Sequence, residues 1–151
     1  MAHPYFADEL LARAKEKGPV TIGLAGAGQM GTDIIVQVAL MPGVRIGAIA
    51  EVRTQNAIDA VILSGRDRSD IAITSNANGI DAAIESGKIA VTDNLGALAA
   101  AGRIDVIIDA TGYRSVRPFD QDRIDPKLCL FEFVYFARPD SQLYGRSVHH
   151  A

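Results

Sequence analysis

The stretch VTIGLAGAGQMGTDIIVQVALMPGVRIGAIA, residues 20–50, decides the fold. It begins with a short apolar run, residues 20–25, whose β-branched start and following glycine turn predict a buried strand. A helix over about residues 29–40 comes next, because Pro42 and Gly43 then stop the helical pattern. Residues 44–50 form a second apolar run, and the whole stretch therefore predicts a strand–turn–helix–strand unit with parallel strands.

The turn of this unit carries three glycines in the pattern G-x-G-x-x-G, and each has a physical reason. Gly26 permits the tight turn, Gly28 has no Cβ to keep a pyrophosphate away, and Gly31 lets the helix lie close to the strand. The N–H groups of Gln29 and Met30 have no partner inside the helix, so they can bond phosphate oxygens. The pattern predicts a dinucleotide site, and the alternative is a glycine-rich turn without a ligand.

Two charged residues after the second strand bear on the choice of dinucleotide. Glu51 follows the glycine pattern by about 20 residues, where an acidic residue binds the adenosine ribose hydroxyls. A carboxylate there favours NAD, because it repels the 2′-phosphate of NADP. Arg53 lies two residues further on and could receive that phosphate. The expected cofactor is therefore NAD or NADP, with NAD slightly favoured.

A third set of candidate site residues follows the run DVIIDA, residues 105–110, which is the most strand-like segment of the chain. Ligands of open parallel sheets bind outside the carboxyl ends of the strands, so Ala110, Thr111 and Gly112 are expected to line the dinucleotide site. The alternative is a plain strand-to-loop turn. Asp109 is interpreted as a polar strand end and not as a catalytic acid.

Strands and helices alternate up to residue 112, which predicts an α/β fold. The fold class is a Rossmann-like, partial doubly wound parallel sheet of about four core strands in the order 3-2-1-4. Thr54 and Asp93 are expected to be helix N-caps. The further elements expected are helices over 6–17, 55–63, 80–86 and 94–101, and strands over 71–74, 89–92 and 105–110.

The sequence changes character after Gly112. Residues 1–112 are expected to form the truncated nucleotide-binding domain, 113–127 a polar linker, and 128–151 an apolar strand with a loose tail. The aromatic run LCLFEFVYF, residues 128–136, predicts a C-terminal strand. We expect it to be an edge strand beside the 105–110 strand or a contact between chains, and a homodimer through it is plausible.

Composition excludes several function classes. The chain has 151 residues and a net charge of −3, which argues against a general nucleic-acid partner. No run reaches the roughly 18 apolar residues of a membrane span, so a cytoplasmic protein is expected. The single cysteine, Cys129, is interpreted as a small buried apolar residue, and His149 and His150 as part of the tail. No metal site is expected.

Four segments carry a resemblance to a known family: IGLAGAGQMGTDIIVQVALMPGV (22–44), AIAEVR (48–53), GIDAAIESGKIAVTDN (79–94) and DVIIDATG (105–112). Over residues 6–112 the chain resembles the NAD(P)-binding domain of homoserine dehydrogenase-like oxidoreductases that carry a SAF domain. The resemblance implies hydride transfer with a nicotinamide cofactor. Members of that family continue into a substrate domain with the catalytic residues, so no catalytic residue can be assigned here.

Residues 118–150 resemble a segment of a different family, the amidophosphoribosyltransferases. The matching core is C-x-F-E-F-V-Y-F-A-R-P-D-S, which begins at Cys129 and ends at Ser141. In that family the segment lies between the glutaminase and phosphoribosyltransferase parts, and neither catalytic set is expected in this chain. The two resemblances together indicate a fusion near residues 113–117. The predicted function is NAD(P) binding with a weak or absent reaction of its own, and the alternative is a chimeric chain with no ligand binding.

Overall fold

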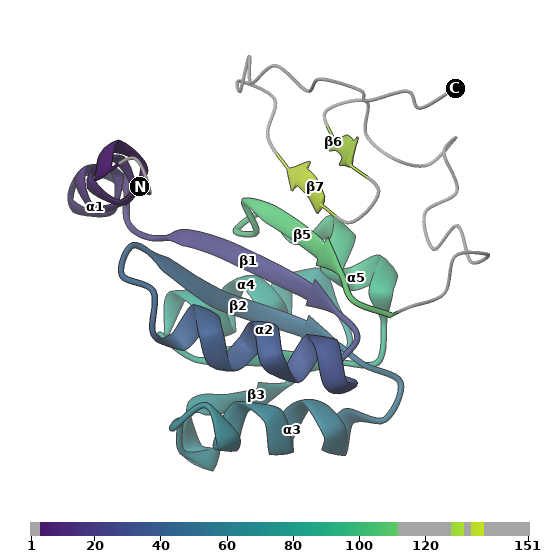
Figure 1. Ribbon diagram of the computed structural model, residues 1–151. Helices are drawn as coiled ribbons and strands as arrows, with labels where there is room; N and C mark the ends of the chain where they lie inside the picture. The colour runs from purple at the N-terminus through teal and green to yellow at the C-terminus, as the bar shows by residue number, and fades with distance from the viewer. Residues whose placement is uncertain (1–3, 112–127, 132–133, 138–151) are drawn as a thin grey trace, which may run out of the picture.

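Helices and strands alternate along the chain in the computed structural model (Figure 1). The structure describes residues 4–111, 128–131 and 134–137. The helices are α1 (Pro4–Lys17), α2 (Gln29–Ala39), α3 (Thr54–Leu63), α4 (Ala77–Glu85), α5 (Leu95–Ala100) and the short 3₁₀ helix η1 (Arg68–Asp70). The strands are β1 (Val20–Ala25), β2 (Val44–Ala50), β3 (Ile71–Ile73), β4 (Ile89–Thr92), β5 (Val106–Asp109), β6 (Leu128–Phe131) and β7 (Val134–Ala137). Within this part of the chain, no helix has the length and apolar character to cross a membrane.

The strands form one sheet in the order β3-β4-β2-β1-β5-β7-β6. The first five are parallel, and β7 and β6 are added antiparallel. The α/β Rossmann-like prediction is confirmed. The central strands β4-β2-β1-β5 match the predicted order 3-2-1-4 when the short strand β3 is left out of the count. Strand β3 extends the sheet at its edge, beside β4.

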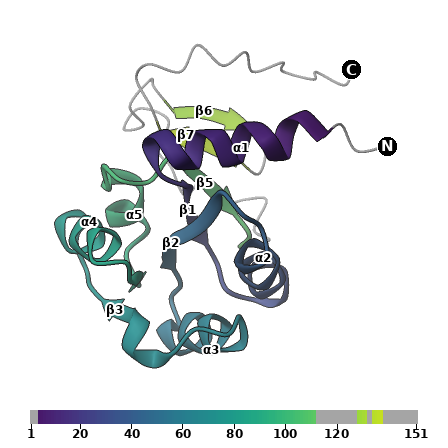
Figure 2. The same cartoon turned by 90° about the vertical axis from the view of Figure 1, so that its left-hand side faces the viewer.

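Helices cover both faces of this sheet, which explains why its strands are mostly apolar (Figure 2). Helices α2 and α3 lie on one face, over a core that includes Leu24 and Ile49. Helices α4 and α5 lie on the other face, over a core that includes Ile80 and Ile107. These four side chains are fully buried, so the central strands contribute to both layers.

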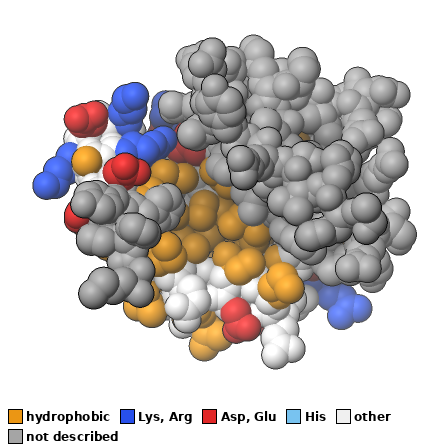
Figure 3. Space-filling model, turned by 45° about the horizontal axis from the view of Figure 1, so that its top comes forward, with side chains coloured by type: hydrophobic (Ala, Val, Ile, Leu, Met, Phe, Trp, Pro, Cys, Tyr) orange, Lys and Arg blue, Asp and Glu red, His pale blue; other side chains and the backbone are white. Residues whose placement is uncertain are grey.

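Strand β5 is covered unequally on its two faces. Ile107 points into the core under α4 and α5 and is fully buried, whereas Val106 and Ile108 on the opposite face are only half-buried. Figure 3 shows apolar side chains gathered beside the charged side chains of α1, in a part of the surface that borders the residues not described.

The aromatic run differs from its prediction. Residues 128–136 were expected to form one strand, but β6 and β7 are two strands that pair antiparallel, with Phe131 opposite Val134. The run has none of the glycine, proline, asparagine or aspartate residues that usually mark a hairpin, so its sequence predicts a single strand. The expected position beside the 105–110 strand is confirmed, because β7 pairs with β5. The homodimer through this segment stays a prediction.

Some predicted features lie outside the described residues. These are Gly112, the linker over 113–127 and the tail beyond residue 137, together with the surroundings of the Cys129 side chain.

Two of the expected helix caps are shifted by one residue. Thr54 is the first residue of α3, and Arg53 holds the N-cap position without a side-chain hydrogen bond. Asn94, and not Asp93, caps α5, because its side-chain oxygen accepts a hydrogen bond from Ala97 N. The sequence patterns therefore place these helices correctly and misassign their first residues.

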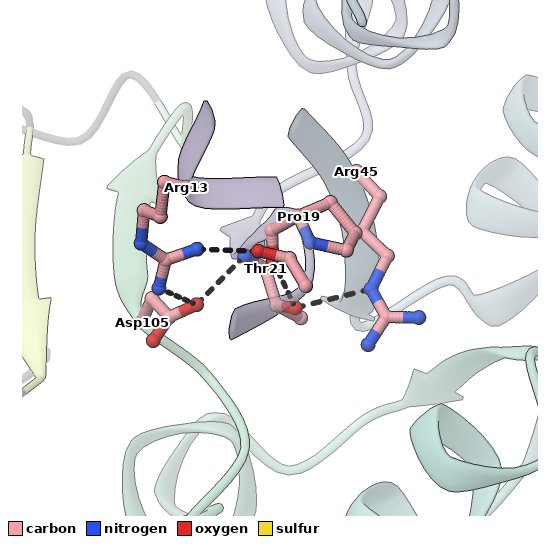
Figure 4. A network of polar contacts seen from close by, with 6 residues as sticks. Arg13, Pro19, Thr21, Arg45 and Asp105 are labelled. Carbon is pink, nitrogen blue, oxygen red and sulfur yellow. Dashed lines mark hydrogen bonds and ion pairs between the residues drawn. The ribbon is translucent and has the colours of Figure 1, made fainter. Parts of the chain in front are cut away.

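A polar network fixes α1 to the amino end of the sheet (Figure 4). One oxygen of the Asp105 carboxylate accepts a hydrogen bond from Thr21 N at 3.0 Å and pairs with the Arg13 guanidinium at 3.3 Å. Arg13 also donates to the carbonyl of Gly18 at 2.8 Å, and Arg45 donates to the Thr21 hydroxyl at 3.1 Å. Asp105 thus connects α1, β1 and the start of β5.

We expect Asp105→Ala to lower the free energy of unfolding by about 2 kcal/mol, because it removes the acceptor of a buried backbone N–H and breaks a charged pair. The control is Asp59→Ala, which removes an exposed carboxylate that is bonded only within α3. That change should cost no more than about 0.5 kcal/mol. Urea denaturation of the full chain measures both values, and equal losses would contradict a special role for Asp105.

Candidate functional site

The carboxyl ends of four parallel strands meet at one edge of the sheet. Ala25 of β1 is the Cα partner of Ala50 of β2 and of Asp109 of β5. Ala50 is in turn the partner of Thr92 of β4. The loops that follow these strands, including the glycine turn after β1, therefore lie next to one another. Strand β1 is the point where the sheet order reverses, and this is where open α/β sheets bind ligands.

The three glycines of the turn occupy different environments. Gly26 has a φ of +90°, and a Cβ there would lie 3.1 Å from the backbone of Ala110. A Cβ on Gly31 would lie only 2.2 Å from the carbonyl oxygen of Gly26, so α2 begins directly against the turn. A Cβ on Gly28 would meet nothing within 4 Å. Gly26 and Gly31 are thus required by close backbone contacts, whereas Gly28 borders open space.

The start of α2 leaves backbone donors accessible. The first bond inside the helix runs from Thr32 N to the carbonyl of Gly28 at 2.9 Å. The N–H groups of Gln29 and Met30 precede it, and no side chain caps this helix. Gly28, Gln29 and Met30 are all exposed. An anion at this position could accept hydrogen bonds from these groups and would lie at the positive end of the helix dipole.

Glu51 follows β2 and extends to the glycine turn. Its Oε2 accepts a hydrogen bond from Ala27 N at 2.7 Å, and its Oε1 accepts one from Arg53 N at 3.0 Å. The sequence assigns this carboxylate to a ribose, but it does not reveal the bond to Ala27. That bond depends on a side-chain rotamer and on the distance between two loops. Neither can be inferred from a sequence pattern.

Arg53 is exposed at the N-cap of α3. Within the described residues its guanidinium has no hydrogen-bond or ion-pair partner, in contrast to Arg13, Arg45, Arg66 and Arg103. It is close in sequence to Glu51 and shares the carboxyl edge with it. The structure therefore places the backbone of Arg53 at the Glu51 carboxylate and leaves its guanidinium exposed at the same edge of the sheet.

The loop after β5 lies against the glycine turn. Ala110 N donates to the carbonyl of Ala25 at 2.7 Å, which continues the β1–β5 pairing, and Ala110 is buried. Asp109 Oδ1 accepts hydrogen bonds from Thr111 N at 2.9 Å and from the Thr111 hydroxyl at 2.7 Å. Asp109 thus closes the turn with its carboxylate, in agreement with its interpretation as a polar strand end.

The structure brings nine of the ten predicted site residues to this edge, and the tenth, Gly112, is not described. Within the described residues, no group of three His, Cys, Asp or Glu side chains could hold a metal ion. The arrangement can present backbone donors, a carboxylate and a guanidinium to a ligand that carries both phosphate and hydroxyl groups.

Comparison with known proteins gives a local similarity only. No family model matches the chain. The amidophosphoribosyltransferase of Mycobacterium leprae is 60% identical over 42 residues, which are 28% of this chain and 7% of that protein. The amidophosphoribosyltransferase of Mycobacterium tuberculosis is 57% identical over 44 residues, and the chloroplastic one of Vigna aconitifolia is 43% identical over 44.

These matches span 7–9% of the length of the proteins concerned. They confirm the predicted similarity of part of the chain to amidophosphoribosyltransferase. They cover too little of the chain to assign it to that family. The resemblance of residues 6–112 to homoserine dehydrogenase-like proteins stays a prediction.

The glycine geometry predicts a large loss of stability for one alanine substitution and a small loss for another. Gly31→Ala should lower the free energy of unfolding by about 2 kcal/mol, because its Cβ would overlap a backbone oxygen that cannot move freely. Gly28→Ala should cost less than about 1 kcal/mol, since its Cβ enters open space and only a helix N-cap is weakened. Thermal or urea denaturation compares the two, and an equal cost would contradict the packing of α2 on the turn.

Proposed function

We propose that the chain binds the pyrophosphate and adenosine part of a nicotinamide dinucleotide at the carboxyl edge around residues 26–31. One observation carries the proposal: the start of α2 has exposed, uncapped N–H groups beside a glycine whose missing Cβ leaves open space. If a neighbouring side chain filled this space or capped the helix, room for a ligand would no longer explain a glycine at position 28. Gly31 needs no ligand to explain it, because backbone contact already does.

The neighbouring residues suit the other parts of such a ligand. The N–H groups of Gln29 and Met30 would bind the pyrophosphate. Glu51 would accept hydrogen bonds from the ribose, and the loop with Ala110 and Thr111 would border the ligand on the β5 side. The choice between NAD and NADP depends on Glu51 and Arg53, and NAD is slightly favoured.

The proposal extends to binding and not to a reaction. The predicted resemblance is to an oxidoreductase family whose catalytic residues lie in a further domain, and Asp109 at this edge is bonded to its own turn. We therefore propose an NAD(P)-binding unit derived from a homoserine dehydrogenase-like oxidoreductase. The competing hypothesis is a chimeric chain that has kept the fold and lost the ligand.

A titration of the full chain with NAD and NADP separates these hypotheses. We expect saturable binding at millimolar ligand or below, measured by calorimetry or by saturation-transfer NMR. Gly28→Val should weaken binding by about tenfold or more, since its side chain would occupy the space of the pyrophosphate. The control is Gly102→Val, where a Cβ meets only the tip of Asp81 at 3.5 Å. No binding by the unmodified chain would favour the chimera without a ligand.

The cofactor preference can be tested at Arg53. We expect NAD to bind more tightly than NADP, because the Glu51 carboxylate repels a 2′-phosphate. Arg53→Ala should weaken NADP about threefold and leave NAD nearly unchanged, as expected for an exposed charge pair. Glu51→Ala should reduce the ratio of NAD affinity to NADP affinity. Tighter binding of NADP by the unmodified chain would show that the preference is wrong.

A further inference from the structure

The Glu51 carboxylate is bonded to the backbone of two loops. Both of its oxygens accept a backbone N–H, one from Ala27 in the glycine turn and one from Arg53 at the start of α3. The bond to Ala27 is the shorter of the two, at 2.7 Å. Glu51 is half-buried and Ala27 is buried, so this charge-assisted bond is partly shielded from water.

Ala27 lies between Gly26, which is bonded to β2, and Gly28, which borders the proposed phosphate site. On one side Gly26 is fixed, because its N–H donates to the carbonyl of Ala50 at 2.8 Å. On the other side Gly28 begins α2 and borders open space. The other polar contact of Ala27 is a 3.4 Å bond from the Thr32 hydroxyl to its carbonyl. The Glu51 carboxylate is therefore the main polar restraint on the residue that leads into the phosphate-facing donors.

We propose that Glu51 is a positioning residue for the glycine turn, in addition to any contact with a ribose, an inference that rests on the proposed function. By holding Ala27 N it fixes the direction in which Gly28 and the N–H groups of Gln29 and Met30 face a phosphate. The role differs from ribose recognition because it acts on a ligand that has no sugar.

Inorganic pyrophosphate distinguishes this role from simple charge repulsion. If Glu51 acts only through its charge, removal of a carboxylate near an anion strengthens pyrophosphate binding, by about twofold for a screened surface charge. If Glu51 positions the turn, its removal releases Ala27 and weakens pyrophosphate binding, by about tenfold for a lost charge-assisted hydrogen bond. The two mechanisms predict effects of opposite sign.

The experiment is a calorimetric or NMR titration of the full chain with pyrophosphate. Glu51→Ala should weaken binding about tenfold. Glu51→Gln keeps an oxygen that can accept from Ala27 N, so it should weaken binding only about threefold. Asp93→Ala is the control, because it removes an exposed carboxylate of the same edge, after β4, and should leave or slightly strengthen binding. Stronger binding by Glu51→Ala would overturn the positioning role and leave the proposed function intact.

Hydrogen exchange of the Ala27 amide gives a second readout that needs no ligand. The amide should be protected in the unmodified chain and in Asp93→Ala, partly protected in Glu51→Gln, and unprotected in Glu51→Ala, while core amides such as that of Leu24 stay protected. An Ala27 amide that exchanges equally in all four proteins would overturn the inference. If the unmodified chain binds neither pyrophosphate nor NAD, the proposed function fails, and the role of Glu51 toward a ligand fails with it.

Discussion

The close contact between Gly31 and the carbonyl of Gly26 is the constraint on which the rest of this structure depends. It lets α2 begin immediately after β1, because the space that a Cβ would need at residue 31 is taken by a backbone oxygen. The positive φ of Gly26 turns the chain out of the strand, and the N–H of the same residue stays bonded to β2. A helix that starts this close to the sheet must pack along it. The chain then returns as β2 beside β1, and the first N–H groups of the helix lie at the carboxyl edge.

The two ends of the sheet use half-buried carboxylates for different purposes. At the amino end, Asp105 connects β1 with α1 and with the start of β5, so its bonds serve the fold. At the carboxyl end, Glu51 makes a bond of the same kind to Ala27, but in a loop whose neighbouring residues are exposed. Glu51 restrains the turn after β1, whereas Asp105 bonds Thr21 within β1 and pairs with Arg13 of α1. The difference lies in what the bonded residues face, which is Arg13 of α1 in one case and the open space beside Gly28 in the other.

Much of this arrangement follows from the sequence because it depends on local backbone chemistry. The glycine spacing, the β-branched run before it and the apolar strand after it predict β1, α2 and β2 and the order of the central strands. The features that the sequence does not predict depend on side-chain rotamers or on chain reversals without turn residues. Asn94 caps α5 in place of Asp93 because both residues can cap and only geometry selects one. Strands β6 and β7 pair antiparallel although no glycine or proline divides their run, and the bond of Glu51 to Ala27 joins residues 24 apart.

The pairing of β7 with β5 shows why the similarity to amidophosphoribosyltransferase says little about function. The free edge of β5 presents unpaired N–H and C=O groups to any extended apolar segment, whatever its origin. An antiparallel strand can satisfy them without the helix that a further parallel strand would require. Strands β6 and β7 therefore complete the hydrogen bonding of the sheet edge through general backbone chemistry. The residues of the proposed nucleotide site lie instead on the loops after β1, β2 and β5. Because function resides in sites and not in folds, the proposal depends on Gly28, Glu51 and Arg53 and not on the added strands.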